Sequence, residues 1–495
     1  MNKFFNTDTL LASGKDALNL IAEEYNNLES KQVVSDVKPG FLRNLLPEEA
    51  PLKGETLKQI ISDTRRFIIP NLTQWQHPNF FAYFPSNMSH GAIVGDMISL
   101  AFNTPGFTWV ASPASTELEN IVVDWIVRFL GLPESWLIKN SGGGTISNTI
   151  GDAIFLSVHA AKHKKMTELA MDFTDPRMLK FVGYYTGICH PQSYKGLYIK
   201  DIPYRREIPI YYNEEVQNYQ IKVDEFEKMV EKDISEGLIP FWCGATLGST
   251  SLGCNDPITE LAAVCKKHGI FVNIDAAWAG AALIVPEIRE EIGKGLEGAD
   301  SMAINFGKWN MCGNNSAVFF VADKTNYRKS LLGGSTPEFL QNKYTNEYDI
   351  IDYKDWQVGL GRRFNSLRFW YMIRSVGVEG MRENVTSKIE LAKVFEDHLK
   401  QNSRFELICK RELALVCFRL VKDKDGNRIA EDKINDINKK LLNGINDTNR
   451  YHLVGSVVQN IHFIRFVICN HNTTREHVEK IWQFIDDLSL KIFDN

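Results

Sequence analysis

Residues 270–280 read IFVNIDAAWAG and residues 301–310 read SMAINFGKWN, and these two stretches decide the fold. Each begins with a short, largely apolar run that is typical of a buried strand. Asp275 closes the first run, and Lys308 follows the second within an apolar, glycine-containing segment. In parallel α/β sheets, ligands bind beyond the carboxyl ends of the strands. The pattern therefore predicts a site at one edge of such a sheet, with Asp275 and Lys308 in it.

The neighbouring segments predict the remainder of the sheet and its covering helices. Residues 240–246 and 317–321 are further apolar runs of strand length, and residues 257–268 carry a helical pattern that Gly269 ends. Short apolar strands separated by amphipathic helices indicate a mostly parallel sheet that is covered on both faces. The fold class that we predict is therefore α/β.

The two ends of the chain differ from this middle part. Residues 1–85 are predicted to be a helical segment, and residues 86–370 form the large α/β domain. Residues 371–495 are predicted to form a smaller α+β domain, with strands at 407–420 and 461–468 and a helix at 476–488. The apolar helices of the N-terminal segment have little of their own to pack against, so we expect them to pair with a second copy of the chain.

Composition excludes several classes of protein. Hydrophobic residues make up 44% and charged residues 24% of the chain, and the net charge is −5, so no nucleic-acid or membrane surface is indicated. The eight cysteines form no CxxC pair, which is typical of buried free thiols and predicts neither disulfides nor a metal site. No run of 18 apolar residues occurs. We expect a cytoplasmic enzyme.

Asp275 and Lys308 are the residue types that carbonyl chemistry needs. A lone aspartate at this place is often only a turn or helix cap, but a buried carboxylate also pairs with a cationic ring nitrogen. A desolvated lysine has a lowered pKa and attacks an aldehyde to form a Schiff base. Lys308 follows Asp275 by 33 residues, which is one strand–helix–strand excursion and brings both to the same edge of the sheet.

Two further features fit a flat, anionic cofactor. The segment 141–149, SGGGTISNT, precedes a helical run, and a glycine-rich loop that opens a helix presents backbone N–H groups to an anion. A plain flexible turn is the alternative for this segment. His190 is either a structural hydrogen-bonding residue or a ring that stacks on an aromatic cofactor.

In this order the four features resemble the layout of fold-type I pyridoxal-phosphate (PLP) enzymes. Longer blocks resemble the group II, PLP-dependent aromatic L-amino acid decarboxylases over nearly the whole chain, from about residue 8 to about residue 490. These blocks are HPNFFAYFPS (77–86), GFTWVASPASTELE (106–119), ATLGSTSLG (245–253), NIDAAWAG (273–280), NFGKWN (305–310) and DYKDWQVGLGRRFNSLRFW (352–370).

The resemblance implies a cofactor, a site and an assembly. Lys308 would bind PLP covalently, Asp275 would contact the ring nitrogen, and His190 would stack on the ring. The other cofactor residues would be Ala277 beneath the ring, Thr246 near its phenolic oxygen, and Thr149, Ile150 and Asn305 at the phosphate. The substrate pocket would comprise Trp75, Tyr83, Phe84, Pro85 and Phe107, with Gly361 at a position that varies with substrate. Family members are homodimers, and Phe107 would come from the partner subunit.

Three residues depart from the family pattern. Gly307 stands where the family has a histidine before the lysine, and Gly151 replaces a serine of the phosphate site. Phe339 falls on the position of the tyrosine that protonates Cα after decarboxylation, and the family's aromatic acetaldehyde synthases also have Phe there. The resemblance thus favours a decarboxylase that consumes O2 and releases an aryl acetaldehyde, CO2, NH3 and H2O2.

Two other readings stay open. A plain decarboxylase would make the arylalkylamine, with Tyr344, Tyr348 or a water molecule as the proton donor. A catalytically silent PLP-binding homologue would explain the three departures together, but it would not explain why Lys308, Asp275 and His190 are all present.

Overall fold

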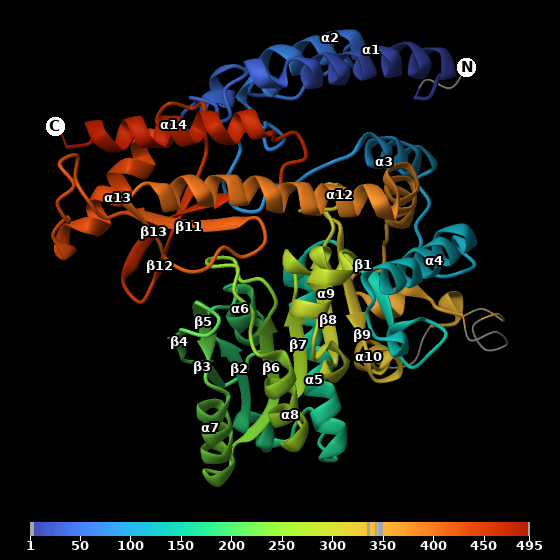
Figure 1. Cartoon of the computed structure of the whole chain (residues 1–495). Coiled ribbons are helices and arrows are strands. Elements are labelled where there is room, and N and C mark those ends of the chain that lie inside the picture. Colours follow the sequence, from blue (N-terminus) through green and yellow to red (C-terminus); the bar gives the residue numbers. More distant parts are fainter. Residues whose placement is uncertain (1–3, 334–336, 342–343, 345–349, 494–495) are drawn as a thin grey trace.

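The computed structural model describes residues 4–333, 337–341, 344 and 350–493 of the chain. Three parts are visible in Figure 1: a helical arm at the N-terminus, a large α/β part and a smaller C-terminal part. The predicted α/β fold with a mostly parallel central sheet is confirmed.

The large part is built on a seven-stranded sheet with the order β1-β9-β8-β7-β6-β2-β3. The five strands β8, β7, β6, β2 and β3 are parallel to one another. Strand β9 is antiparallel to both of its neighbours, β8 and β1. The strands are β1 (Gly143–Ser147), β2 (Phe181–Thr186), β3 (Tyr204–Ile208), β6 (Ile239–Thr246), β7 (Phe271–Asp275), β8 (Ser301–Asn305) and β9 (Ala317–Val321). The predicted strands at 240–246, 270–274, 301–304 and 317–321 are confirmed.

Helices cover both faces of this sheet. One face packs against α5 (Ile150–Glu168), which also contacts α6 (Gln192–Ile199) and α10 (Lys324–Leu331). The remaining helices of this part are α4 (Pro113–Leu130), α7 (Val223–Ser235), α8 (Ile258–Lys267) and α9 (Pro286–Ile292), and a hairpin of β4 (Ile210–Asn213) and β5 (Asn218–Ile221) lies beside them. Burial on both faces explains why the inner strands β6, β7, β8 and β9 are largely apolar, whereas the edge strand β3 is charged and partly exposed.

The C-terminal part is an antiparallel sheet with the order β10-β11-β13-β12. Its elements are β10 (Phe405–Leu407), β11 (Leu415–Leu420), β12 (Val454–Val458), β13 (Ile461–Val467), α13 (Glu431–Asn446) and α14 (Arg475–Lys491). The single strand predicted at 407–420 is wrong, because the chain reverses between β10 and β11, with Leu413 in the left-handed region at φ 49°.

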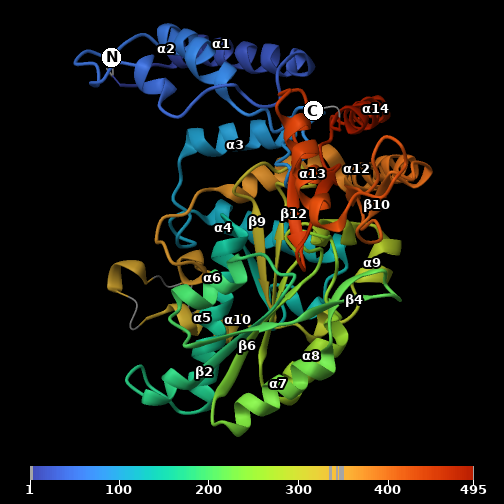
Figure 2. The same ribbon diagram turned by 90° about the vertical axis from the view of Figure 1, so that its left-hand side faces the viewer.

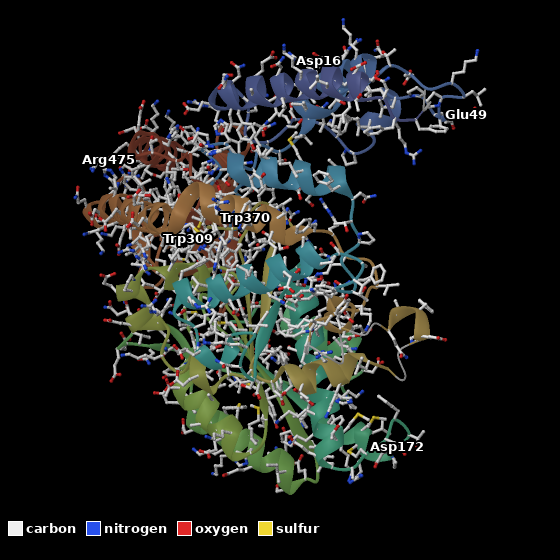
Figure 3. All side chains as sticks on the ribbon, turned by 90° about the vertical axis from the view of Figure 1, so that its right-hand side faces the viewer. Asp16, Glu49, Asp172, Trp309, Trp370 and Arg475 are labelled. Atoms are coloured by element: carbon white, nitrogen blue, oxygen red, sulfur yellow. The ribbon has the colours of Figure 1, made fainter. Side chains whose placement is uncertain are left out.

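Helix α12 (Asn365–Gln401) joins the two parts and runs across the predicted boundary at 370/371. It bends at Gly377, whose φ of 74° is favourable only for glycine. Figure 3 labels Trp370 on this helix and Trp309 near it, and the Asn384 amide of α12 donates a hydrogen bond to the Trp309 carbonyl at 3.0 Å. The segment after Lys308 is thereby anchored to α12. The two predicted domain boundaries, at 85/86 and 370/371, stay predictions.

The N-terminal arm comprises α1 (Thr7–Asn26) and α2 (Leu57–Asp63), and α3 (His90–Phe102) follows it and packs against α12. Figure 2 shows α1 and α2 along one margin of the molecule, away from the large sheet. Large apolar side chains of the arm are exposed, among them Leu11 at 76% and Leu52. Across the described residues, no helix combines the length and apolarity needed to cross a membrane.

Candidate active site

The sheet register brings the predicted site residues together. Thr246 pairs with Asp275 at the ends of β6 and β7, and Asp275 pairs with Ala303 of β8. Beyond these ends lies a cavity of about 210 Å³. It is lined by Thr149, Ile150, Gly151, His190, Gln192, Thr246, Gly248, Thr250, Asp275, Ala277, Asn305 and Lys308. All eight residues that were predicted to hold the cofactor are among them.

The anion-binding end of the cavity is the start of α5. The Thr149 hydroxyl accepts a hydrogen bond from the Asp152 N–H at 3.1 Å, and the Asp152 carboxylate accepts one from the Thr149 N–H. This capping box fixes a 19-residue helix whose positive end faces the cavity, where Thr149, Ile150 and Gly151 line the wall.

The predicted glycine-rich loop is wrong in its extent. Residues 143–147 form β1, a buried strand, and only two residues separate it from α5. The glycines are needed because neighbouring groups lie too close for side chains. A Cβ at Gly142 would lie 2.5 Å from the Val321 carbonyl oxygen, and one at Gly144 would lie 2.9 Å from Phe320. The cavity begins at Thr149, after the glycines.

The opposite end of the cavity carries the carboxylate of Asp275. Asp275 is 5% exposed, and one of its oxygens accepts a hydrogen bond from the Ala277 N–H at 3.0 Å. Beside it, Asp256 accepts hydrogen bonds from the Thr246 N–H at 2.8 Å and from the Thr186 hydroxyl at 2.9 Å, while burial raises the pKa of Asp256 to about 7. Asp256 therefore fixes the Thr246 backbone.

Lys308 lines the same cavity. Burial lowers the pKa of the Lys308 ammonium below its usual value of 10.5, and the Asp275 carboxylate partly opposes this effect. Burial also lowers the pKa of His190, whose Nδ1 accepts a hydrogen bond from the Gln192 N–H at 3.2 Å. An uncharged imidazole ring is suited to stacking, and a desolvated amine is suited to attack on an aldehyde.

A second cavity of about 540 Å³ shares Lys308 and Asn305 with the first. Two predicted substrate residues, Trp75 and Phe84, line it. Tyr83 stacks on Trp75 with ring centroids 5.6 Å apart, and Pro85 is buried next in the chain. The first cavity thus offers contacts for an anion and a flat ring, and the second offers aromatic walls. Lys308 lines both cavities.

Three other predicted residues do not join this group within one chain. Phe107 is half-buried and does not line either cavity, and Gly361 lines a separate cavity of about 490 Å³ together with Ser147 and Arg362. Phe339 lies on a short 3-10 turn, Glu338–Leu340, with 82% of its surface exposed. For these three residues the predicted roles require a second subunit or a movement of the loop.

Sequence reasoning missed the contribution of the C-terminal part. Arg465 of β13 and Cys469 are buried, and both lie close enough to Lys308 to influence its charge. Arg465 had a visible signal, since it is a lone arginine inside the apolar run FIRFVI at 463–468. A charged residue in a buried strand is expensive unless it has a role.

The two glycines that depart from the family pattern are not equivalent. A Cβ at Gly307 would lie 2.1 Å from the Gly313 carbonyl oxygen, so the backbone has closed over the space of a side chain. Two backbone hydrogen bonds of Asn87 hold the same turn. The Asn87 N–H donates to the Gly307 carbonyl, and the Asn87 carbonyl accepts from the Gly313 N–H, both at 2.7 Å. At Gly151 the nearest group is the Gln192 amide oxygen at 3.1 Å, the end of a side chain that can move.

The residues present fit PLP. The hydroxyl of Thr246 is buried and has no hydrogen-bond partner among the described residues, so it can bond to a polar ligand in the cavity. A helix start suits a phosphate, a buried carboxylate suits a protonated ring nitrogen, and Lys308 suits an aldehyde. The fold and these groups define a PLP-dependent enzyme of fold type I.

Comparison with known proteins identifies the family. Residues 39–421 match the model of the pyridoxal-dependent decarboxylase conserved domain. Tyrosine decarboxylase 4 of Petroselinum crispum is 37% identical over 477 residues, covering 96% of this chain and 92% of the relative. Phenylacetaldehyde synthase of Arabidopsis thaliana is 36% identical over 485 residues, covering 98% and 96%. The crystal structure of Oryza sativa TDC with PLP and tryptamine aligns with a TM-score of 0.94 at 31% identity, covering 99% of both chains.

The chain belongs to the pyridoxal-dependent decarboxylase family and is a PLP-dependent carboxy-lyase. The predicted family and cofactor are confirmed. The roles of the individual site residues stay predictions, although the cavity places the eight cofactor residues around one volume.

Proposed function

We propose that the protein decarboxylates an aromatic L-amino acid and releases the aryl acetaldehyde. The observation that carries the product is Phe339, a residue without a hydroxyl at the position where the decarboxylases have a proton-donating tyrosine. The aromatic substrate class is supported by the names of the relatives and by Trp75 and Phe84, which wall the cavity next to Lys308.

Each end of the site has a distinct task in this reaction. When bound, PLP withdraws the electron pair that departing CO2 leaves on Cα of the substrate. Asp275 would hold a proton on the ring nitrogen by its negative charge, and the start of α5 would hold the phosphate through Thr149, Ile150 and Gly151. His190 covers the ring face, and the walls of the second cavity exclude water from the substrate side chain.

The product depends on what reaches Cα next. A positioned hydroxyl delivers a proton, a step typically worth about 10²–10⁴-fold in rate, and yields the amine. Without that hydroxyl, O2 can take two electrons from Cα and become H2O2, and water then releases ammonia. The balanced reaction converts amino acid, O2 and H2O into aryl acetaldehyde, CO2, NH3 and H2O2.

The test is Phe339→Tyr, which adds one hydroxyl with almost no change in ring volume. Purified protein is supplied with Phe, Tyr, Trp and DOPA in turn, and CO2, O2, amine, aldehyde and peroxide are measured together. We expect the native protein to consume one O2 per CO2, and Phe339→Tyr to shift most of the flux to amine. Amine formation by the native protein without O2 uptake would replace this proposal with a plain decarboxylase.

The plain decarboxylase stays the second candidate because of Tyr344. This residue packs on Trp109 with ring centroids 4.8 Å apart, five residues beyond Phe339 in the same loop. Tyr348 lies outside the described residues. Tyr344→Phe would then abolish amine formation, whereas under the aldehyde proposal it leaves the product ratio unchanged. CO2 release with any of the four substrates would exclude the catalytically silent homologue. The cytoplasmic location of the protein stays a prediction.

We also propose that a second copy of the chain completes the site. The exposed leucines of the N-terminal arm support this assembly, and so does the fact that neither Phe107 nor Phe339 lines the two cavities at Lys308 within one chain. Mixing inactive Lys308→Ala with inactive Phe107→Ala should restore about a quarter of the native activity, if chains pair at random and one site of each mixed dimer is intact. A monomer by sedimentation, or no recovery on mixing, would contradict it.

A further inference from the structure

Arg465 carries a buried charge to which the roles given above assign no task. It lies within β13, where its backbone pairs with Cys417 of β11 and Val454 of β12, and it is 3% exposed. Within the described ranges no Asp or Glu forms an ion pair with it, and burial lowers the pKa of its guanidinium. Burying an unpaired guanidinium is unfavourable, and arginine does not lose its proton, so the cost needs an explanation.

The contacts of Arg465 direct it toward the site. Its Nη2 donates to the Tyr83 carbonyl at 3.3 Å, while its Nε is buried without a hydrogen-bond partner in the part of the chain that is described. Tyr83 has φ 54°, the left-handed region that few non-glycine residues adopt. The Arg465 Cζ lies 5.2 Å from the centroid of the Phe84 ring.

Lys308 shares that ring with Arg465. The Lys308 Nζ lies 5.1 Å from the centroid of Phe84. Phe84 cannot move aside easily, because it stacks on Trp278 at 4.2 Å and Trp278 stacks on Trp309 at 5.2 Å. Each cation is attracted to the ring, and the two cations repel each other in surroundings with little water.

Three other titratable groups influence the charge of Lys308: Asp275, His190 and Cys469. The Asp275 carboxylate favours the ammonium form of Lys308, and the His190 imidazole contributes repulsion only when it is protonated, which burial disfavours. Burial raises the pKa of the Cys469 thiol to about 12, and its sulfur accepts a hydrogen bond from the Trp278 Nε1 at 3.1 Å. Burial is the main cause that lowers the pKa of Lys308, and the Arg465 guanidinium acts in the same direction as burial.

We propose that Arg465 is a positioning residue whose fixed charge, held beside Phe84, keeps the Lys308 amine neutral and ready to capture the cofactor aldehyde. The role rests on the proposed function of Lys308. This role gives the C-terminal part a direct task in the chemistry. Arg465, on strand β13 of the small sheet, would act on the protonation state of Lys308, which follows strand β8 of the large sheet.

The test measures Lys308 itself. PLP is added to the cofactor-free, full-length protein over a range of pH, borohydride stops the reaction after a short time, and mass spectrometry gives the fraction of Lys308 modified. Arg465→Gln keeps an N–H donor and removes the charge. We expect the midpoint of the pH dependence to rise by about one unit, with capture below that midpoint slowed about tenfold.

Matched variants separate charge from structure. Arg465→Lys keeps the charge and should keep the native midpoint, and Arg465→Met replaces Arg465→Gln if the latter does not fold. Arg419→Gln removes a buried arginine from the same sheet, at β11, and should leave the midpoint unchanged.

Two results would overturn the role of Arg465: an unchanged midpoint in the uncharged variants, or an equal shift in Arg465→Lys. Modification of a lysine other than Lys308 would instead refute the proposed function of Lys308, so the two failures are distinguishable.

Discussion

The cofactor cavity and the segment that carries Phe339 are built in opposite ways. The cavity is enclosed by strand ends and a helix start, and within one chain it gathers residues that are up to 159 positions apart, from Thr149 to Lys308. Phe339 lies on one short turn and is 82% exposed. Under the proposed function, decarboxylation depends on an enclosed sheet edge, whereas the product depends on a residue of an exposed segment.

Lys308→Ala tests the enclosed sheet edge most severely. Without the amine the protein should form no borohydride-stable bond to PLP, and turnover should fall by more than about 10⁴-fold, the upper range for a positioned catalytic group. Visible absorption and mass spectrometry of the reduced protein report the bond. Covalent loading of Lys308→Ala at another residue, at the native level, would show that the cavity has been assigned wrongly.

Asp275→Ala should separate cofactor binding from chemistry. The phosphate contacts at the start of α5 remain, so some PLP should still bind, but turnover should fall by about 10²–10³-fold because charge stabilisation at the ring nitrogen is lost. Equilibrium dialysis gives the affinity and CO2 release gives the rate. A variant that keeps native turnover would leave Asp275 with only its turn hydrogen bond to Ala277.

Gly307→Ala and Gly151→Ala are expected to have the smallest effects, and they compare two glycines that line the two cavities at Lys308. The Cβ at position 307 meets a carbonyl oxygen at 2.1 Å, so the turn must shift, and we expect a loss of about 1–3 kcal/mol in the free energy of unfolding. The Cβ at position 151 meets a movable amide at 3.1 Å, near the start of a helix, and we expect a change within about 1 kcal/mol. Chemical denaturation measures both. Equal effects would contradict the assignment of Gly307 as a backbone requirement.

Much of the site was accessible from the sequence because its residues follow strand ends directly. Asp275 ends β7, Thr246 ends β6 and Asn305 ends β8, and the parallel register alone brings them to one edge. The glycine-rich segment was misjudged because a buried strand that needs close backbone approach has the same composition as a loop. The strand predicted at 407–420 failed for a different reason, because the charged residues Lys410, Arg411 and Glu412 were taken as part of one strand, whereas they lie in the reversal between β10 and β11.

The sequence by itself determined the fold class, the family and eight of the residues that line the Lys308 cavity, because periodicity and ordered motifs are local properties of the chain. Only the tertiary structure showed that Gly307 is closed by the Gly313 carbonyl while Gly151 is open, and that Arg465 and Lys308 approach the same Phe84 ring. Such facts depend on contacts between residues more than 150 positions apart, or on backbone turns whose closure no local pattern encodes. The electrostatic surroundings of a side chain and the room available to it depend on residues that the fold brings close, and the order of residues along the chain does not specify them.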